Sequence, residues 1–433
     1  MMSLFPQLHS ESSHHESDQP SATPAEAGVH GSSVSLSEAF LHSSSRTRDT
    51  LPEQYQSIFD ELRSGILAFC KEFAIPVETL RSKEDFGKQL ASKKISPERM
   101  AEAVLLFQQL EHLVTHGEPL KETLPEYLQK TERLYNLTEQ YTAQVKLLER
   151  IGILKGGVIK GIDGHQYPIP TLEQIAKRLY EREKELSIKR DQGFTKLLLV
   201  PFGMSLDDFY ETLEQFLLSY KQKHSDFDLN ISNPFKVWSW YKGADLGDPP
   251  DLVYNPKFFR KDHQGKTKLQ ILEEQTVAQD SFPGWKVHLF QPSDPSDQES
   301  KGFAPAPRQD QGKIQGEENP RPDLETNKTP IEYLSILQKA QDDPTSPYFQ
   351  ESGLTPEDWI LAFITHLEET RQPLDDYRND KEESIICLAG VFSPSSFCVF
   401  FAHWYRDHRQ VSMSEDFPGN RGGSSGVRTS VMV

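Results

Sequence analysis

The side chains best suited to chemistry are concentrated near the end of this sequence, between Phe392 and Arg428. Aromatic residues, histidine, arginine, serine and aspartate are mixed there without helical or alternating order, and leucine, isoleucine, lysine and threonine are absent. A hydrophobic core needs regular apolar spacing, whereas aromatic rings, arginine forks and small polar side chains are typical of binding surfaces. The segment therefore predicts a ligand-binding surface. The alternative is an irregular, loop-rich end of a domain, in which the aromatic rings fill gaps between loops.

Two catalytic chemistries are alternatives in this segment and just before it. Cys387 and Cys398 could supply soft thiolates to Cu(I). However, Cys387 lies in the apolar run SIICLAG, which predicts a buried strand, and buried cysteines are usually inert. His403 and His408 lie close to Asp407, a combination that can perform acid–base catalysis when the geometry is right. An enzyme is therefore an alternative, and a protein without catalytic activity is the favoured interpretation.

Two further motifs do not predict a site. Gly265-Lys266-Thr267 resembles the end of a phosphate-binding loop, but Arg260 occupies the position of the first glycine, so no glycine-rich loop surrounds a phosphate. Asp375 and Asp376 belong to an acidic run that could contribute to a calcium site, but such runs are more often solvated loops. We expect no cofactor and no metal.

Composition excludes several classes of protein. The 433 residues carry a formal net charge of −18, which argues against nucleic-acid binding because phosphate neutralisation requires a basic surface. No secretory signal is visible and no apolar run is long enough to span a bilayer, so we expect no membrane partner. Three scattered cysteines are typical of a reducing compartment. These features favour the cytoplasm by default, although surface display is not excluded.

The N-terminal part of the chain predicts an arm and helices. Residues 1–50 are rich in serine and histidine and poor in apolar residues, which predicts a disordered arm. Residues 51–118 predict a small helical region. Residues 119–152 predict a long amphipathic helix, either a coiled coil that could form a homo-oligomer or a helix packed within its own chain. Four apolar residues there are spaced seven apart, namely Tyr127, Leu134, Tyr141 and Leu148.

The remainder of the chain predicts a mixture of strands and helices. Residues 153–291 alternate short apolar strands with amphipathic helices, which predicts a mixed α/β part. Residues 292–326 are acidic and rich in proline, and predict either a flexible linker or an insertion within one domain. Residues 327–433 contain two helices that begin Thr-Pro, followed by the aromatic tail. The fold class that we predict is α+β.

The tail also carries a family resemblance. The matching features are Trp404 and Arg406, then Asn420-Arg421 before a Gly/Ser loop, and finally Gly426-Val427-Arg428 before a terminal strand. In these features the tail resembles the C-terminal C-type-lectin-like module of variable proteins made by diversity-generating retroelements. That module is related to the formylglycine-generating-enzyme fold. The stretches FTKLLLVPFGMSLDDFYETL and LTPEDWILAFITHLEET also resemble hypothetical-protein families of uncultured, small-genome bacteria whose members end in such tails. The resemblance covers residues 120–433.

The resemblance implies which residues vary and which support them. In that family, reverse transcription substitutes adenines in a template, so the affected codons change, and the varied side chains lie on one solvent-facing patch of a rigid lectin-like scaffold. Scaffold positions would be Trp404, Arg421, Gly426, Val427 and Arg428. The candidate ligand-binding residues are Phe397, Val399, Phe400, His403, Tyr405, Asp407, His408, Ser412, Ser414, Asp416, Gly422 and Ser424.

The resemblance therefore implies a non-enzymatic recognition protein that binds a protein or glycan ligand through a diversifiable C-terminal surface. Oligomerisation through residues 119–152 would add avidity to individually weak sites. One alternative is an oxidoreductase of the formylglycine-generating type that uses Cys387 and Cys398 to hold copper. Another is an assembly protein that acts through the helix at residues 119–152.

Overall fold

The chain folds into two compact units, and each is described by itself. The computed structural model describes residues 44–77, 89, 93, 95, 97–119, 125–238, 241–378 and 384–433. The units are residues 1–123 and residues 124–433. Both helices and strands are present in the described residues, which confirms the α+β class. Most of the predicted disordered arm lies outside the described residues.

The smaller unit is helical. Its helices are α2 (Ser44–Asp49), α3 (Glu53–Glu72) and α5 (Pro97–His116). Phe59 and Ile66 on α3 share one hydrophobic cluster with Phe107 and Leu110 on α5. Cys70 lies in the same cluster with an exposed fraction of 1%, and burial raises the pKa of its thiol to about 11. This cysteine is therefore a packing residue.

The larger unit begins with two helices where the sequence predicts one. Asn136 divides α6 (Glu126–Tyr135) from α7 (Leu137–Arg150), and its φ of 47° lies in the left-handed region, which asparagine tolerates better than most residues. The residues of the predicted coiled-coil seam pack on the main hydrophobic core of their own chain. The side-chain amide of Gln140 also donates to the carbonyl oxygen of Thr195 at 3.1 Å. This arrangement favours the packed-helix alternative over the coiled coil.

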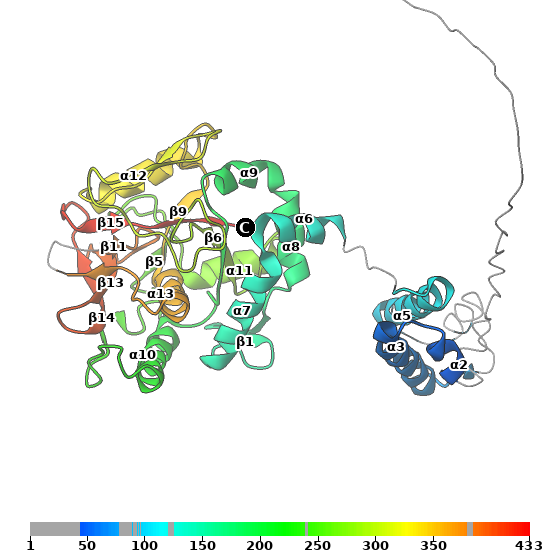
Figure 1. The fold of residues 1–433 in the computed structure, drawn as a ribbon. Helices are drawn as coiled ribbons and strands as arrows, with labels where there is room; N and C mark the ends of the chain where they lie inside the picture. Colours follow the sequence, from blue (N-terminus) through cyan, green and yellow to red (C-terminus); the bar gives the residue numbers. More distant parts are fainter. Residues whose placement is uncertain are drawn as a thin grey trace, which may run out of the picture. The chain divides into compact units, whose positions relative to one another are not determined.

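Next come a short hairpin and a four-stranded antiparallel sheet. The hairpin is β1 (Val158–Lys160) with β2 (Gln166–Pro168), followed by α8 (Leu172–Glu181) and α9 (Glu183–Asp191). The sheet has the order β3-β6-β16-β9. Two of its strands, β6 and β9, are labelled in Figure 1. Its strands are β3 (Lys196–Val200), β6 (Lys286–Phe290), β16 (Thr429–Met432) and β9 (Glu351–Gly353). The terminal strand β16 therefore lies inside a sheet, between β6 and β9, and not at its edge.

A six-stranded sheet contains most of the aromatic tail. Its main path is β15-β11-β13-β14-β4, and β10 pairs with β13. The strands are β4 (Phe235–Val237), β10 (Asp376–Tyr377), β11 (Ile385–Cys387), β13 (Val399–Tyr405), β14 (Gln410–Asp416) and β15 (Ser425–Val427). The tail is thus more regular than its sequence predicts. In β13 the first six residues are all buried, so both faces of the strand are covered and no alternation appears in the sequence.

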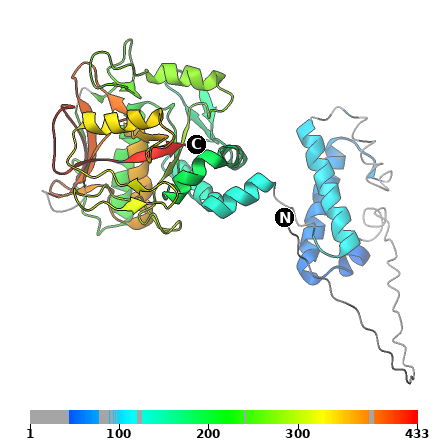
Figure 2. The same ribbon diagram turned by 90° about the horizontal axis from the view of Figure 1, so that it is seen from above.

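Four helices complete the larger unit. They are α10 (Leu206–Lys223), α11 (Lys268–Val277), α12 (Pro330–Gln341) and α13 (Pro356–Thr370). Helix α13 packs against β3 of one sheet and β13 of the other. Figure 1 shows α13 beside β13, and Figure 2 shows the same ribbon turned by 90°. The rings of Trp359 and Phe363 on α13 lie in the main core. Helices α12 and α13 both begin with complete capping boxes, at Thr329 with Glu332 and at Thr355 with Asp358, as their Thr-Pro starts predict.

Residues 292–326 form part of the larger unit. They include the short strand pair β7 (Ile314–Gln315) and β8 (Arg321–Pro322). Outside this segment, β5 (Val253–Tyr254) and β12 (Val391–Phe392) form another short pair. Phe303 and Arg321 are only 1% and 3% exposed, respectively. The segment is therefore attached to the folded core by buried side chains at both ends of its length, and belongs to the same compact unit as the strands on either side of it.

Candidate functional site

The pairing of β13 with β14 places several of the candidate residues on one face of the sheet. The register pairs Val399 with Asp416, His403 with Ser412 and Tyr405 with Gln410. Because side chains alternate between faces along a strand, paired residues share a face, and so do residues two apart. We call this part of the face the hairpin face, defined by His403, Tyr405, Ser412, Ser414 and Asp416.

The hairpin face differs in exposure from one end to the other. Tyr405, Ser414 and Asp416 are half-buried, whereas His403 and Ser412 are 5% and 7% exposed. Neighbouring strands add two side chains to the same face, because Tyr377 on β10 pairs with Tyr405 and Lys236 on β4 pairs with Ser412. The face is therefore a shallow, mixed aromatic and polar surface supported from both sides by strands.

The remaining candidates lie in loops or in the core. Phe397 is 49% exposed, and Asp407 and His408 are exposed in the turn between β13 and β14. Gly422 and Ser424 are half-buried in the loop that leads into β15. Val399 and Phe400 are 0% and 2% exposed, so neither can contact a ligand in this structure.

The two buried candidates have clear packing roles. Val399 lies in a hydrophobic cluster with Tyr333 on α12 and Cys387 on β11. Phe400 points to the other side of the sheet, where its ring centroid lies 3.7 Å from that of Tyr241 in a T-shaped contact. These contacts make both residues part of the scaffold. Sequence spacing could not reveal this, because it depends on which elements cover each face of β13.

His403 has the least satisfied polar atom on the hairpin face. Its ring lies 5.5 Å from Tyr377 and 5.6 Å from Tyr405 between centroids, and Nδ1 has no hydrogen-bond partner among the described residues. Burial lowers the pKa of His403 to about 4, so its imidazole is neutral at pH 7. A neutral ring retains one donor and one acceptor nitrogen. Because Nδ1 is itself buried, a ligand on the hairpin face does not reach it in this structure.

A buried ion pair fixes the strands behind the hairpin face. Arg428, between β15 and β16, donates to Asp375 Oδ1 at 2.6 Å and also to the carbonyl oxygen of Ala304. The indole Nε1 of Trp359 donates to Asp375 Oδ2 at 2.8 Å. Burial raises the pKa of Asp375 despite the lowering effect of Arg428. This contact joins α13, both sheets and the segment at 292–326 at one point.

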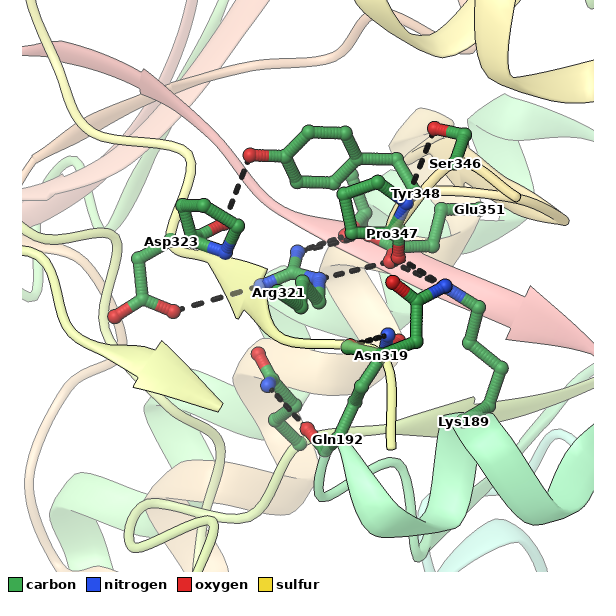
Figure 3. Close-up of polar contacts among 12 residues, drawn as sticks. Lys189, Gln192, Asn319, Arg321, Asp323, Ser346, Pro347, Tyr348 and Glu351 are labelled. Atoms are coloured by element: carbon green, nitrogen blue, oxygen red, sulfur yellow. Dashed lines mark hydrogen bonds and ion pairs between the residues drawn. The ribbon is translucent and has the colours of Figure 1, made fainter. Parts of the chain in front are cut away.

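A second ion network anchors the same segment to the four-stranded sheet (Figure 3). Arg321 on β8 donates from Nε and Nη2 to the two carboxylate oxygens of Glu351 on β9, both at 2.8 Å. Lys189 on α9 donates to Glu351 Oε1 at 2.7 Å, and Thr429 on β16 donates to Oε2 at 2.6 Å. Burial raises the pKa of Glu351, but Arg321 and Lys189 lower it more, so it lies below its usual range. Because every oxygen of Glu351 is satisfied, we interpret this network as structural.

The two cysteines considered for copper binding are both buried and free. Burial raises the pKa of the Cys387 thiol, and burial is also the main cause that raises that of Cys398. Both effects disfavour the thiolate that binds Cu(I). The described residues contain no group of three or more histidine, cysteine, aspartate or glutamate side chains arranged to hold a metal ion.

One arrangement resembling catalytic machinery was not predicted. Ser430 Oγ lies 3.0 Å from His288 Nδ1, and His288 Nε2 lies 3.2 Å from Asp358 Oδ1. However, the exposed fraction of each of the three residues is 2% or less, and that of Ser430 is 0%. No substrate can reach that hydroxyl, so the three residues form a polar contact within the core. The three residues lie far apart in the sequence and share no motif, so nothing in the sequence predicts this contact.

Comparisons with known proteins add no assignment. No protein-family model, curated protein or solved structure matches the chain. In the described part of the chain, no helix has the length and hydrophobicity that crossing a membrane requires.

Proposed function

We propose that this chain is a non-enzymatic recognition protein that binds a protein or glycan ligand through the hairpin face and the adjoining turn. The module would be lectin-like and diversified, as in the retroelement variable proteins that the tail resembles. The observation that carries the proposal is the β13–β14 register, because it gathers five candidates that are scattered in sequence onto one face.

Support also comes from the separation between this face and its scaffold. The opposite face of the hairpin carries Phe400, Ala402 and Trp404, all of which lie in the main core. The ring of Trp404 stacks on Phe363 of α13, with 6.4 Å between centroids. Tyr405, Ser414 and Asp416 on the hairpin face are only half-buried, so these side chains can change while the buried residues of the opposite face stay constant.

The chemistry of the surface suits a varied ligand. Tyr405 stacks on His408 with 4.4 Å between ring centroids, and Tyr377 lies 6.0 Å from Tyr405. Tyrosine rings provide contact area at low entropic cost, and serine and aspartate provide adaptable hydrogen bonding, as in antibody paratopes. The surface therefore has aromatic anchors surrounded by small polar groups, and the buried residues Val399 and Phe400 are excluded from it.

Two libraries of the full chain, displayed on phage, test the proposal. The surface library randomises Tyr405, Asp407, His408, Ser414 and Asp416. The control library randomises the residues of the opposite face, namely Phe400, Ala402, Trp404, Val411 and Met413. Protease resistance measures folding, and selection on immobilised proteins and glycans measures binding.

We expect most surface-library members to resist protease and to yield binders against several targets. Most control-library members should be cleaved. Equal losses of folding in both libraries would contradict the separation of surface from scaffold. A well-folded surface library that yields no binder would contradict the recognition function.

A further inference from the structure

A large cavity lies in another part of the larger unit and shares no residue with the hairpin face. Its volume is about 910 Å³, which is within the range of small-molecule sites. Helices α8 and α11, the loop at residues 255–266 and the ends of β6 and β16 supply its lining. The inference that follows does not depend on the proposed function.

Two residues that line this cavity carry a buried donor without an acceptor among the described residues. Trp285 is 1% exposed, and its indole Nε1 has no partner among the described residues. The same is true of the buried Nε of Arg178. An indole nitrogen and a guanidinium nitrogen can only donate. Both nitrogens have almost no solvent-accessible surface, so they lie behind the cavity wall, and a ligand in the cavity does not reach them in this structure.

A further donor is the ammonium of Lys286, whose residue is 6% exposed and lines the cavity, and which is not among the fully buried nitrogens. It lies 4.0 Å from the ring centroid of Phe202 and 3.9 Å from Asp358 Oδ2. The second distance is too long for a hydrogen bond, and Lys286 makes no side-chain hydrogen bond to the residues that the structure describes. A buried ammonium normally needs closer anionic partners than these.

The charge of the cavity points in the same direction. Five of its lining residues are basic and three are acidic, although the whole chain carries a net charge of −18. Apolar side chains provide much of the rest, including Ile271, Phe282 and Met432. An organic anion would pair with Lys286 through its charged group and cover the apolar lining with its body.

We propose that this cavity binds a small organic anion, such as a carboxylate or sulfonate, attached to an apolar or aromatic body. The anionic group lies against the ammonium of Lys286, and the body lies against α11 and the end of β16. Binding gives that ammonium a closer anionic partner than Asp358 at 3.9 Å, so the anion is recognised more strongly than a neutral molecule of the same shape.

Calorimetry on the full chain with 1-naphthoate tests the proposal, and 1-naphthalenemethanol serves as its neutral counterpart. We expect naphthoate to bind with a Kd below about 1 mM, and the alcohol to bind at least about tenfold more weakly. Ala278→Trp places a large ring in the cavity lining, and we expect it to abolish binding. Val277→Trp is the matched control, because Val277 is 80% exposed and does not line the cavity.

A charge variant separates anion recognition from simple apolar binding. Lys286→Gln should weaken naphthoate at least about tenfold and leave the affinity for the alcohol unchanged. Urea denaturation of each variant establishes that it is folded. If Lys286→Gln does not fold, Ala278→Trp still tests whether the cavity binds naphthoate. The proposal is overturned if naphthoate does not bind at about 5 mM, if the alcohol binds as tightly, or if Ala278→Trp binds like the native chain.

Discussion

Replacing Arg428 with methionine tests how the strands behind the hairpin face are held. The substitution keeps an unbranched side chain in a site that is 6% exposed, but removes the ion pair with Asp375 and the donor to Ala304. Asp375 is completely buried, and among the described residues its carboxylate would retain only the hydrogen bond from Trp359. The variant would therefore contain a buried carboxylate without a cationic partner.

The expected loss in the free energy of unfolding at pH 7 is about 3–5 kcal/mol, the usual effect of removing one partner from a buried ion pair. The loss should shrink as the pH falls from 7 to 5. Burial already raises the pKa of Asp375 in the native protein, and without Arg428 the folded state would bind that proton more strongly still. Since protonation removes the uncompensated charge, the native protein and the variant should become more similar in acid.

Urea denaturation followed by tryptophan fluorescence measures this effect, because all five tryptophans belong to the larger unit. Arg421→Met is the matched control: Arg421 pairs with Glu332 at 2.6 Å, but their side chains are 49% and 45% exposed. Exposed pairs contribute little, so we expect the control to lose less than about 1 kcal/mol. Equal losses in the two variants, or a loss at Arg428 that grows in acid, would refute the reasoning.

Three further predictions concern acid stability, the two faces of β13 and thiol reactivity. Burial, and then Arg428 and Lys196, lower the pKa of His366 to about 3, so the folded state resists protonation below the unfolded value of about 6.5. The stability that this group contributes above pH 6.5 should be lost at up to about 1.4 kcal/mol per pH unit as the pH falls toward 3. Urea titrations at pH 7, 5.5 and 4.5 should therefore show a shallower decline in stability for His366→Asn than for the native protein. Phe400→Ala should cost about 3–5 kcal/mol and Tyr405→Ala less than about 1 kcal/mol in the same assay, and similar values would argue against a separate surface and scaffold. Cys387 is 0% exposed, so a thiol reagent should modify it only in urea, and modification within minutes in native buffer would contradict its burial.

The sequence predicts features that depend on neighbouring residues. The capping boxes at Thr329 and Thr355 were predictable because a capping threonine and an acid three residues later are a local signal. The apolar runs that form β3 and β6 were predictable for the same reason. Break points are harder: Asn136 divides a helix because its backbone is left-handed there, and nothing in the periodicity of residues 119–152 marks that position.

Features that depend on distant pairing could not be predicted. Arg321 and Glu351 form an ion pair across 30 positions, and Arg428 and Asp375 across 53. The burial of Val399 and Phe400 depends on α12 and α13 covering the two faces of one strand. A strand that is covered on both faces has no alternating pattern of apolar and polar residues. Composition alone therefore predicts a surface there, although Val399 and Phe400 belong to the core. The cavity beside α11 likewise unites residues that no sequence motif connects.

The most direct test of the recognition proposal is to sequence the DNA that flanks the gene and search for a near-copy of the segment encoding Phe392–Arg428. The account predicts a second repeat beside a reverse-transcriptase gene, with differences at adenines that fall on codons of the hairpin face and its turn, such as those of Tyr405 and His408. Codons for Trp404 and Arg428 should be identical in both copies. Absence of a repeat, or differences spread equally over surface and core codons, would contradict diversified binding.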